Sequence, residues 1–593
     1  MEVVDIEAQL HSKHQQTMLP LRLLRRALQD FTTNPICSQG NLIRQLKSSS
    51  FVLRNSYSSN YYVDSPLSSV EIPNLTINNY ILNNVEKWPE KTAMECGISG
   101  RKYTYSQLKT LSKNVALGLL NSGLQPGQVI TIILPNMPEF IIAMIGALQA
   151  GLIVSTVNPL YNADEIRYQL LDSESSLVIT YQQKINDVNE AINKIENNKL
   201  FPTVVINNPS DSLPQGTRSF RELLETRNND ETLLKGVKSD PDSTAFLLYS
   251  SGTTGLPKGV ILSHRQIVSN CEQLSHPALK IAYETSETYQ DVVMCILPLF
   301  HCYGLSVNSL SNLYCGTKLI TLPKFEPESF LKLLKECTIA YFVPPLIQFL
   351  ANNPSVTAEN MKKLRSILNG AAAISVTDAH KLLSKKHMII NSGYGMTEAG
   401  PVITACRNTC VDLDTVGIPL SNSQLKIVDI ETGETLDPSQ PGEICCKGPQ
   451  VMSGYYKNEE ATAATLKDGW LHTGDVGYLN EERHLFIVDR MKELIKVKGF
   501  QVAPLELEET LRQHPGVSDV AVVGKPDSRY GEVPVAFIVP TPGKEPTEKE
   551  LLSFIATKVA EYKQINSVIF MTSIPKNTTG KILRKTLKET LLK

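Results

Sequence analysis

Short apolar runs alternate with helical patterns over most of the chain. The apolar runs have the length of buried strands, and the stretches between them read as helices. Strands that alternate with helices usually form sheets in which the strands run parallel. The pattern therefore predicts an α/β fold with largely parallel sheets, with strands at residues 129–134, 177–181, 245–249, 292–297 and 340–343 and a helix at residues 139–150.

The longest apolar stretch covers residues 140–157 and contains Gly146, Gln149 and Gly151. It falls short of the ~20 apolar residues that a membrane span needs. We therefore expect a buried helix that runs into a buried strand, and no membrane span.

The pattern changes after about Gly417, where short β runs lie between Gly, Pro and Asp turns. Beyond Asp489, charged helices alternate with strands. The sequence predicts a large N-terminal domain at residues 70–489, built of parallel-type sheets and helices plus a β-rich subdomain. A small, mobile α+β C-terminal domain follows at residues 490–593. The β runs are at residues 424–428, 442–447 and 485–488, and the later elements are helices 504–512 and 547–559 and strands 517–523 and 534–539.

Residues 1–65 form an N-terminal extension whose composition differs from that of the rest of the chain. Between Met18 and Val63 the only acidic residue is Asp30, while arginines and serines are frequent and apolar residues recur at helical spacing. Such a stretch is typical of a mitochondrial targeting segment. Acidic residues before Met18 argue against it, unless translation starts at Met18. The alternatives are a disordered tail or a helix docked on a cytoplasmic enzyme. The C-terminal residues are not the peroxisomal Ser-Lys-Leu signal.

Composition excludes several classes of protein. The chain has 593 residues, of which 42% are hydrophobic and 20% charged, so it is neither disordered nor fibrous. Its net charge of −2 gives no basic field for nucleic acid. The 11 cysteines form no CxxC pair, which makes a zinc site or a disulfide framework unexpected.

The strongest chemical motif is residues 249–259, YSSGTTGLPKG, which follow an apolar strand and precede a helix near Ser263. Glycines at Gly252 and Gly255 let the backbone turn and offer N–H groups to an anion. Hydroxyls and an ammonium add donors for phosphate oxygens. These are Ser250, Ser251, Thr253, Thr254 and Lys258. The segment thus predicts a phosphate cradle, although it lacks the Gly-Lys-Ser/Thr order of a Walker A motif. The alternative is a structural Gly-rich turn.

This loop resembles the phosphate-binding signature of the adenylate-forming enzymes, which include acyl-CoA synthetases, luciferases and adenylation domains. The resemblance extends from about residue 74 to residue 584. Within this family, the sequence is most similar to 4-coumarate:CoA-ligase-like acyl-CoA synthetases. Six further segments match in order: residues 297–305 (LPLFHCYGL), 393–400 (GYGMTEAG), 442–448 (GEICCKG), 469–475 (GWLHTGD), 489–496 (DRMKELIK) and 577–584 (NTTGKILR).

For several residues, chemistry alone allows a role that differs from the one that the resemblance implies. Asp475 follows a Thr-Gly turn, where its carboxylate could accept hydrogen bonds from ribose hydroxyls or form an Asx turn. Glu398 could hold Mg²⁺ beside the phosphates or be a solvated loop carboxylate. Thr397 could bind the α-phosphate or cap a turn. His301 lies in an apolar run, so the residues alone favour a histidine buried in the core. The resemblance implies instead that His301 lies at the mouth of an acyl pocket.

The resemblance also implies roles that the residues alone do not establish. Lys581 would act in adenylation and Lys496 in thioester formation, with Lys492 as the hinge between two conformations. Arg490 would contact ribose, and Ser392, Gly393 and Tyr394 would bind adenine. Lys498, Gly499 and Lys324 would lie near CoA. The acyl pocket would be lined by Tyr303, Val307, Gly370, Ala371, Gly395, Pro401 and Val402.

The chain departs from plant 4-coumarate:CoA ligases at three places. Ser392 stands where their adenine motif usually has Gln, Cys446 and Lys447 replace an apolar residue and an arginine, and Val307 stands where serine is frequent. Val307 makes the pocket more apolar, so fatty acids and other aromatic acids compete with hydroxycinnamates as expected substrates.

The resemblance implies an ATP-dependent acid:CoA ligase that forms an acyl-CoA through an acyl-adenylate, with ATP, Mg²⁺ and CoA bound. The expected acid is an aromatic propenoate or a fatty acid. One alternative is a luciferase-type monooxygenase on the same scaffold. Another is a pseudoenzyme that binds nucleotide, against which the intact Glu398, Asp475 and Lys581 argue. We expect residues from about 74 onward to carry the whole activity.

Overall fold

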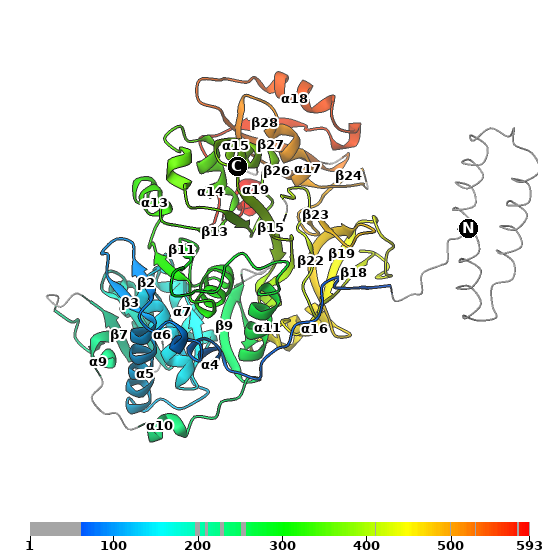
Figure 1. Cartoon of the computed structure of the whole chain (residues 1–593). Helices are drawn as coiled ribbons and strands as arrows, with labels where there is room; N and C mark the ends of the chain where they lie inside the picture. Colours follow the sequence, from blue (N-terminus) through cyan, green and yellow to red (C-terminus); the bar gives the residue numbers. More distant parts are fainter. Residues whose placement is uncertain are drawn as a thin grey trace, which may run out of the picture. The chain divides into compact units, whose positions relative to one another are not determined.

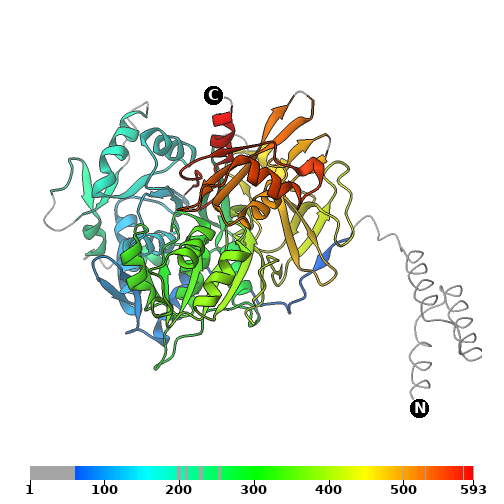
Figure 2. The same ribbon diagram turned by 90° about the horizontal axis from the view of Figure 1, so that it is seen from above.

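The alternating apolar runs fold into two mostly parallel sheets, as the sequence predicts. The computed structural model describes residues 61–195, 202–207, 212–225, 231–250, 256–409, 411–498, 500–527, 529–577 and 580–591. The predicted mitochondrial segment before residue 61 lies outside these residues. Figures 1 and 2 show the unit that begins at Tyr61, with its C-terminal elements in orange and red.

The first sheet has 8 strands, and five neighbouring pairs run parallel, from the third strand in the sheet order to the last. The predicted strand at residues 177–181 is observed at the same residues. In sheet order the strands are β20 (Gly454–Tyr455), β10 (Lys258–Ser263), β9 (Thr244–Ser250), β5 (Ile153–Thr156), β4 (Val129–Ile132), β6 (Leu177–Tyr181), β7 (Thr203–Ile206) and β8 (Thr217–Ser219).

The second sheet has 9 strands and is parallel from β15 to β2, with antiparallel strands at both ends. Its core strands are apolar on both faces, as expected for a parallel sheet covered by helices. In order they are β17 (Ile418–Pro419), β16 (Val402–Ala405), β15 (Ile389–Gly395), β14 (Ser366–Asn369), β13 (Ile339–Phe342), β11 (Val292–Cys295), β12 (Lys318–Thr321), β2 (Thr92–Cys96) and β3 (Lys102–Thr104).

Helices cover these sheets. The predicted helix at residues 139–150 is α6 (Pro138–Gln149), which is buried almost throughout and leads into β5. Within the described residues, no helix has both the length and the apolar character to cross a membrane. The others before residue 460 are α4 (Ile77–Leu82), α5 (Tyr105–Asn121), α7 (Ala163–Asp172), α8 (Ile185–Asn193), α9 (Phe220–Leu224), α10 (Thr232–Lys235), α11 (His264–Leu274), α12 (Ser311–Tyr314), α13 (Pro327–Leu334), α14 (Pro344–Asn352), α15 (Val376–Lys385) and α16 (Glu459–Thr465).

The predicted β-rich subdomain is an antiparallel sheet, and the C-terminal elements form a separate α+β layer with its own apolar cluster. The fold class predicted from the sequence is therefore confirmed. The subdomain strands are β1 (Val63–Asp64), β18 (Gln424–Val428), β19 (Gly442–Lys447), β22 (Trp470–Leu479), β21 (Leu466–Lys467) and β23 (Leu485–Arg490). The later elements are β24 (Ile495–Val497), β25 (Phe500–Val502), α17 (Pro504–Arg512), β26 (Val517–Asp527), β27 (Gly531–Pro540), α18 (Glu548–Ala556), β28 (Ser567–Phe570) and α19 (Arg584–Leu591).

The helix predicted near Ser263 is observed as α11, but the sequence did not predict the strand that lies between the phosphate loop and this helix. That strand, β10, pairs antiparallel with β9. The helix α11 begins only after Ser263, whose hydroxyl accepts a hydrogen bond from the Gln266 N–H in a capping box. The two strands that flank the predicted loop thus pair antiparallel, with Lys258 opposite Ser250.

The last residues of the predicted extension are part of this fold. Val63 is 6% exposed, and β1 pairs with β18. Ser65 donates its hydroxyl to the Pro419 carbonyl at 2.7 Å, and the Val70 N–H donates to Asn422 at 3.0 Å. The strand β1 therefore forms an edge of the β-rich sheet, and hydrogen bonds hold the residues that follow it against the same unit.

We expect a chain that begins at residue 74 to unfold a few degrees below one that begins at residue 61. The longer chain keeps the burial of Val63 and the hydrogen bonds of β1, which together contribute a few kcal/mol at most. Thermal unfolding of the two purified chains measures the difference. Equal midpoints would contradict a stabilising role for β1, and the full-length chain serves as the reference.

Candidate active site

Ser250 ends β9 and Lys258 begins β10, the two strands of the first sheet that the phosphate loop connects. The Ser250 hydroxyl donates to Oε1 of Glu398 at 2.9 Å, which joins the loop to the segment expected to hold Mg²⁺. Lys258 begins β10, and its ammonium lies 5.2 Å from the centre of the Tyr455 ring. Ser251, Gly252, Thr253, Thr254 and Gly255 lie outside the described residues.

Thr397 and Glu398 lie in a single 3-10 turn after β15 and are buried, with exposed fractions of 8% and 6%. The Thr397 hydroxyl is 3.4 Å from the Cys302 sulfur. Gly395 has to be glycine, because a Cβ there would lie 2.0 Å from the Pro401 carbonyl oxygen. This close approach turns the chain sharply, so that Glu398 points back at the hairpin.

Asp475 lies on β22, opposite Arg490 of β23. Its Oδ2 accepts a hydrogen bond from the Tyr394 hydroxyl at 2.8 Å, and its Oδ1 lies 3.3 Å from Nε of Arg490. Only 8% of Asp475 is exposed. The three residues expected to bind adenosine therefore lie together, with Ser392 and Gly393 on the same strand as Tyr394.

Glu443 supports the turn that carries Asp475, a role that sequence reasoning missed. Its Oε1 accepts from the Gly474 N–H at 3.1 Å, and its Oε2 lies 2.8 Å from Nδ1 of His472. Burial would raise the pKa of Glu443, but the hydrogen bond from His472 reverses this effect and holds the pKa below its ordinary value. The only sequence signal was the GEICCKG segment itself.

Cys445 completes this cluster, because its sulfur lies 3.4 Å from Nδ1 of His472. The possible ligand atoms of Glu443, Cys445 and His472 lie within 4.8 Å of one another. However, burial raises the pKa of the Cys445 thiol far above its ordinary value, and the Nδ1 atom is already engaged by Glu443. The arrangement is accounted for as a hydrogen-bonded support of the Asp475 turn.

Lys581 of the C-terminal loop lies among these residues. Desolvation and the positive charge of Arg490 together lower the pKa of Lys581 to about 8, against the opposing effect of Asp475. Burial lowers the pKa of His301 to about 4, with an added contribution from Lys581. The structure thus brings Lys581, Arg490, Asp475 and His301 together, although they are far apart in the sequence.

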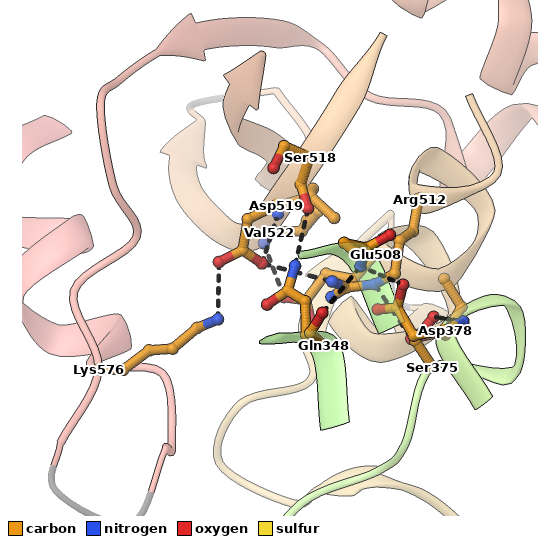
Figure 3. Close-up of polar contacts among 12 residues, drawn as sticks. Gln348, Ser375, Asp378, Glu508, Arg512, Ser518, Asp519, Val522 and Lys576 are labelled. Atoms are coloured by element: carbon orange, nitrogen blue, oxygen red, sulfur yellow. Dashed lines mark hydrogen bonds and ion pairs between the residues drawn. The ribbon is translucent and has the colours of Figure 1, made fainter. Parts of the chain in front are cut away.

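The C-terminal layer contacts the helix α14 beside this loop (Figure 3). Gln348 of α14 donates to the Ser518 carbonyl at 3.0 Å. Asp519 accepts from Lys576 at 2.6 Å and from Arg512 at 3.3 Å. A Cβ at Gly580 would lie 2.8 Å from Cδ of Pro345, so the backbone beside Lys581 passes directly over the start of α14.

Three of the expected lysines lie elsewhere in this conformation. Lys496 is exposed on β24, and its backbone N–H donates to Glu532. Lys498 lies 3.9 Å from Glu561 and over the Tyr530 ring. Lys324 is exposed after β12. Gly499 lies outside the described residues. Lys492, the expected hinge residue, follows β23, where desolvation and Arg490 lower its pKa.

The expected acyl pocket is closed on one side by Tyr303. Its hydroxyl donates to the Leu368 carbonyl at 2.9 Å, and a Cβ at Gly370 would lie 2.9 Å from its ring. Val307 is 1% exposed, and beyond it lies a cavity of about 30 Å³ that is also lined by Tyr341. The other expected pocket residues are Ala371, exposed with a φ of 70°, Gly395, Pro401 and Val402 at the start of β16.

The pKa of Lys581 makes ATP binding sensitive to pH. Below about 8 the ammonium is charged and attracts the phosphates; above that pH it becomes neutral in the free protein, and binding must then take up a proton. We expect the affinity for Mg·ATP to fall by up to roughly tenfold per pH unit above that value. Calorimetry between pH 7 and 9 measures it. Lys581→Arg should flatten the profile and Lys496→Arg should not; a flat profile in the unmodified protein would contradict this.

Comparison with known proteins agrees with this geometry. The AMP-binding enzyme family matches residues 81–456, and the AMP-binding enzyme C-terminal domain matches residues 506–581. The chain is similar to 4-coumarate–CoA ligase 1 of Solanum tuberosum, with 40% identity over 543 residues, 89% of this chain and 96% of that protein. It is 38% identical to 4-coumarate–CoA ligase 1 of Arabidopsis thaliana over 548 residues, 91% of this chain and 96% of that protein. ATP-bound MatB from Rhodopseudomonas palustris has a similar structure, with a TM-score of 0.77, 27% identity, and coverage of 87% of this chain and 99% of that chain.

Proposed function

The chain belongs to the AMP-binding enzyme family, and we propose that it is an ATP-dependent acid:CoA ligase whose acid substrate is a compact aromatic propenoate. The observation that best supports this activity is the cluster of Asp475, Tyr394 and Arg490 with Lys581 beside it. A ribose-binding carboxylate and a mobile cation next to an anion-binding hairpin are suited to chemistry at the α-phosphate of ATP.

In the first half-reaction, an oxygen of the acid's carboxylate attacks the α-phosphorus of ATP, and pyrophosphate leaves. Asp475 accepts hydrogen bonds from ribose hydroxyls and so fixes the α-phosphate relative to the acid. The Lys581 ammonium neutralises negative charge that builds on the phosphate oxygens in the transition state. In the second half-reaction, the sulfur of CoA attacks the acyl carbon and AMP leaves.

Glu398 is the residue that would hold Mg²⁺. It is a buried carboxylate beside the phosphate hairpin, and hard cations prefer such oxygen ligands. Both hydroxyls that contact it donate to Oε1, and within the described ranges no donor contacts Oε2. Bound Mg²⁺ would neutralise charge on the ATP phosphates. We further propose that Lys496 acts in thioester formation and that Lys498, Gly499 and Lys324 contact CoA in a second conformation about Lys492.

One wall of the expected pocket favours a compact aromatic acid over a long fatty acid. The Tyr303 hydroxyl donates to the Leu368 carbonyl of β14, and the Tyr303 ring lies against Gly370, so this ring is a fixed, flat wall of the pocket. The names of the similar plant enzymes support an aromatic propenoate.

A screen of acid-dependent pyrophosphate release with cinnamates, benzoates and fatty acids of increasing length tests the proposal. We expect cinnamates to be fastest and long fatty acids to be slowest. Fastest turnover of a long fatty acid would overturn the substrate proposal, and no release with any acid would overturn the ligase proposal. Light emission with luciferin and O₂ would favour a luciferase-type reaction instead.

We also propose that the N-terminal segment directs the enzyme to mitochondria, because residues 18–63 are arginine-rich and nearly free of acidic residues. Residues 18–70 fused to a fluorescent protein should colocalise with a mitochondrial marker. A diffuse cytoplasmic signal would overturn this proposal, and the same fusion with its arginines replaced by glutamine is the control.

A further inference from the structure

Two hydroxyl groups from different strands meet at one oxygen of Glu398. The Ser250 hydroxyl donates to Oε1 at 2.9 Å, and the Tyr455 hydroxyl donates to the same atom, also at 2.9 Å. Ser250 belongs to the phosphate-binding motif. Tyr455 belongs to no motif that sequence reasoning singled out, and it lies 57 positions beyond Glu398 in the chain.

The position of Tyr455 is fixed by the strand that carries it. In β20, Tyr455 pairs with Val260 of β10, and its N–H donates to the Thr462 hydroxyl at 2.9 Å. The next residue, Tyr456, donates its N–H to the Gly259 carbonyl at 2.7 Å. The strand β20 is therefore attached directly to β10, the strand that follows the phosphate motif in the chain, and the ring of Tyr455 has a defined place beside it.

Tyr455 contacts two groups of opposite charge. Its hydroxyl bonds the Glu398 carboxylate, and the Lys258 ammonium lies 5.2 Å from the centre of its ring. A cation at this distance from a tyrosine ring is attracted by the ring electrons. Glu398 and Lys258 are the two charged side chains proposed to act on the phosphates, so one tyrosine holds both.

The two bonds to Oε1 also determine how Glu398 is presented. A carboxylate held at one oxygen by two hydroxyls cannot rotate freely, so its second oxygen has a fixed direction. Groups that orient a metal-binding carboxylate in this way typically contribute a factor of roughly ten to a hundred to metal affinity. From these contacts we infer that Tyr455 is a positioning residue, which orients Glu398 for a divalent cation and holds Lys258 over the phosphates. This inference rests on the proposed role of Glu398.

The test compares Tyr455→Phe with Tyr456→Phe in the full chain. The first change removes only the hydroxyl at Glu398, while the second removes a hydroxyl that bonds Glu174 at the surface. Calorimetric ATP binding is measured over a series of Mg²⁺ concentrations, and once more with EDTA. We expect Tyr455→Phe to need roughly ten- to a hundredfold more Mg²⁺ for half-maximal binding. ATP binding in EDTA should be unchanged in Tyr455→Phe, and Tyr456→Phe should match the unmodified protein in both conditions.

Further outcomes separate this inference from the proposed function. If Glu398→Gln binds Mg·ATP like the unmodified protein, the proposed role of Glu398 fails. If Glu398→Gln loses the Mg²⁺ response while Tyr455→Phe keeps a normal one, the role of Tyr455 is overturned. A lower melting temperature of Tyr455→Phe with normal Mg²⁺ dependence also overturns it, since that is what a merely structural tyrosine predicts. If Tyr455→Phe does not fold, Ser250→Ala, which removes the other donor to Oε1, must shift the Mg²⁺ dependence in the same direction, or the inference fails.

Discussion

Replacing Lys581 with alanine is expected to lower acid-dependent pyrophosphate release by about 10²–10³-fold. In the structure Lys581 is half-buried near Asp475 and Arg490, where an ATP α-phosphate would be bound. The loss should fall on the rate rather than on ATP affinity alone, because the charge that Lys581 neutralises grows as the transition state forms. Stopped assays of pyrophosphate release measure this half-reaction.

The same variant should still convert a supplied acyl-adenylate and CoA into thioester. Lys496→Ala should keep adenylation and slow thioester formation, because Lys496 is exposed on β24 and faces the site only in the proposed second conformation. Lys585→Ala is the matched control, since it removes an exposed lysine four residues beyond Lys581. Equal loss of one half-reaction in Lys581→Ala and Lys496→Ala, with folding intact, would contradict the two-conformation mechanism. No change in either variant would mean that both are ordinary surface lysines.

The elements that the sequence predicted well are those whose pattern is local. The helix α6 and the strand β6 are apolar almost throughout, so their positions follow from burial alone. The strand β10 was missed because it lies at the edge between a Gly-rich loop and a helix cap. Its structure depends on pairing with β9 and β20, which no local period reveals.

The site divides in the same way. Asp475, Glu398 and Lys581 could be identified because their motifs resemble a known signature, and the structure adds the partners of each. Glu443 and Tyr455 could not be identified from the sequence, because each acts through a partner residue that comes close only when the strands pair. Tyr394 and Asp475 are 81 positions apart, and Glu443 and Gly474 are 31 apart, so sequence spacing contains no sign of either contact.

Replacing Asp475 with alanine is expected to weaken ATP binding on the order of 10²-fold. Hydrogen bonds to a charged group contribute about 1.5–3 kcal/mol each, and the buried carboxylate has two oxygens for the ribose hydroxyls. Its contacts with Tyr394 and Arg490 hold these oxygens in place but are not themselves the source of the affinity. Calorimetric titration with Mg·ATP measures the loss, and Tyr394→Phe, which leaves the carboxylate, should cost less than tenfold.

Deoxy-ATP separates a ribose contact from a structural role of Asp475. In the unmodified protein, removing one ribose hydroxyl should weaken binding, because the carboxylate loses a donor. In Asp475→Ala the same removal should cost nothing more, since the partner is already absent, and the two changes together should be non-additive. If the costs simply add, Asp475 acts only as a turn residue that supports β22 and β23, and the ribose assignment would be wrong.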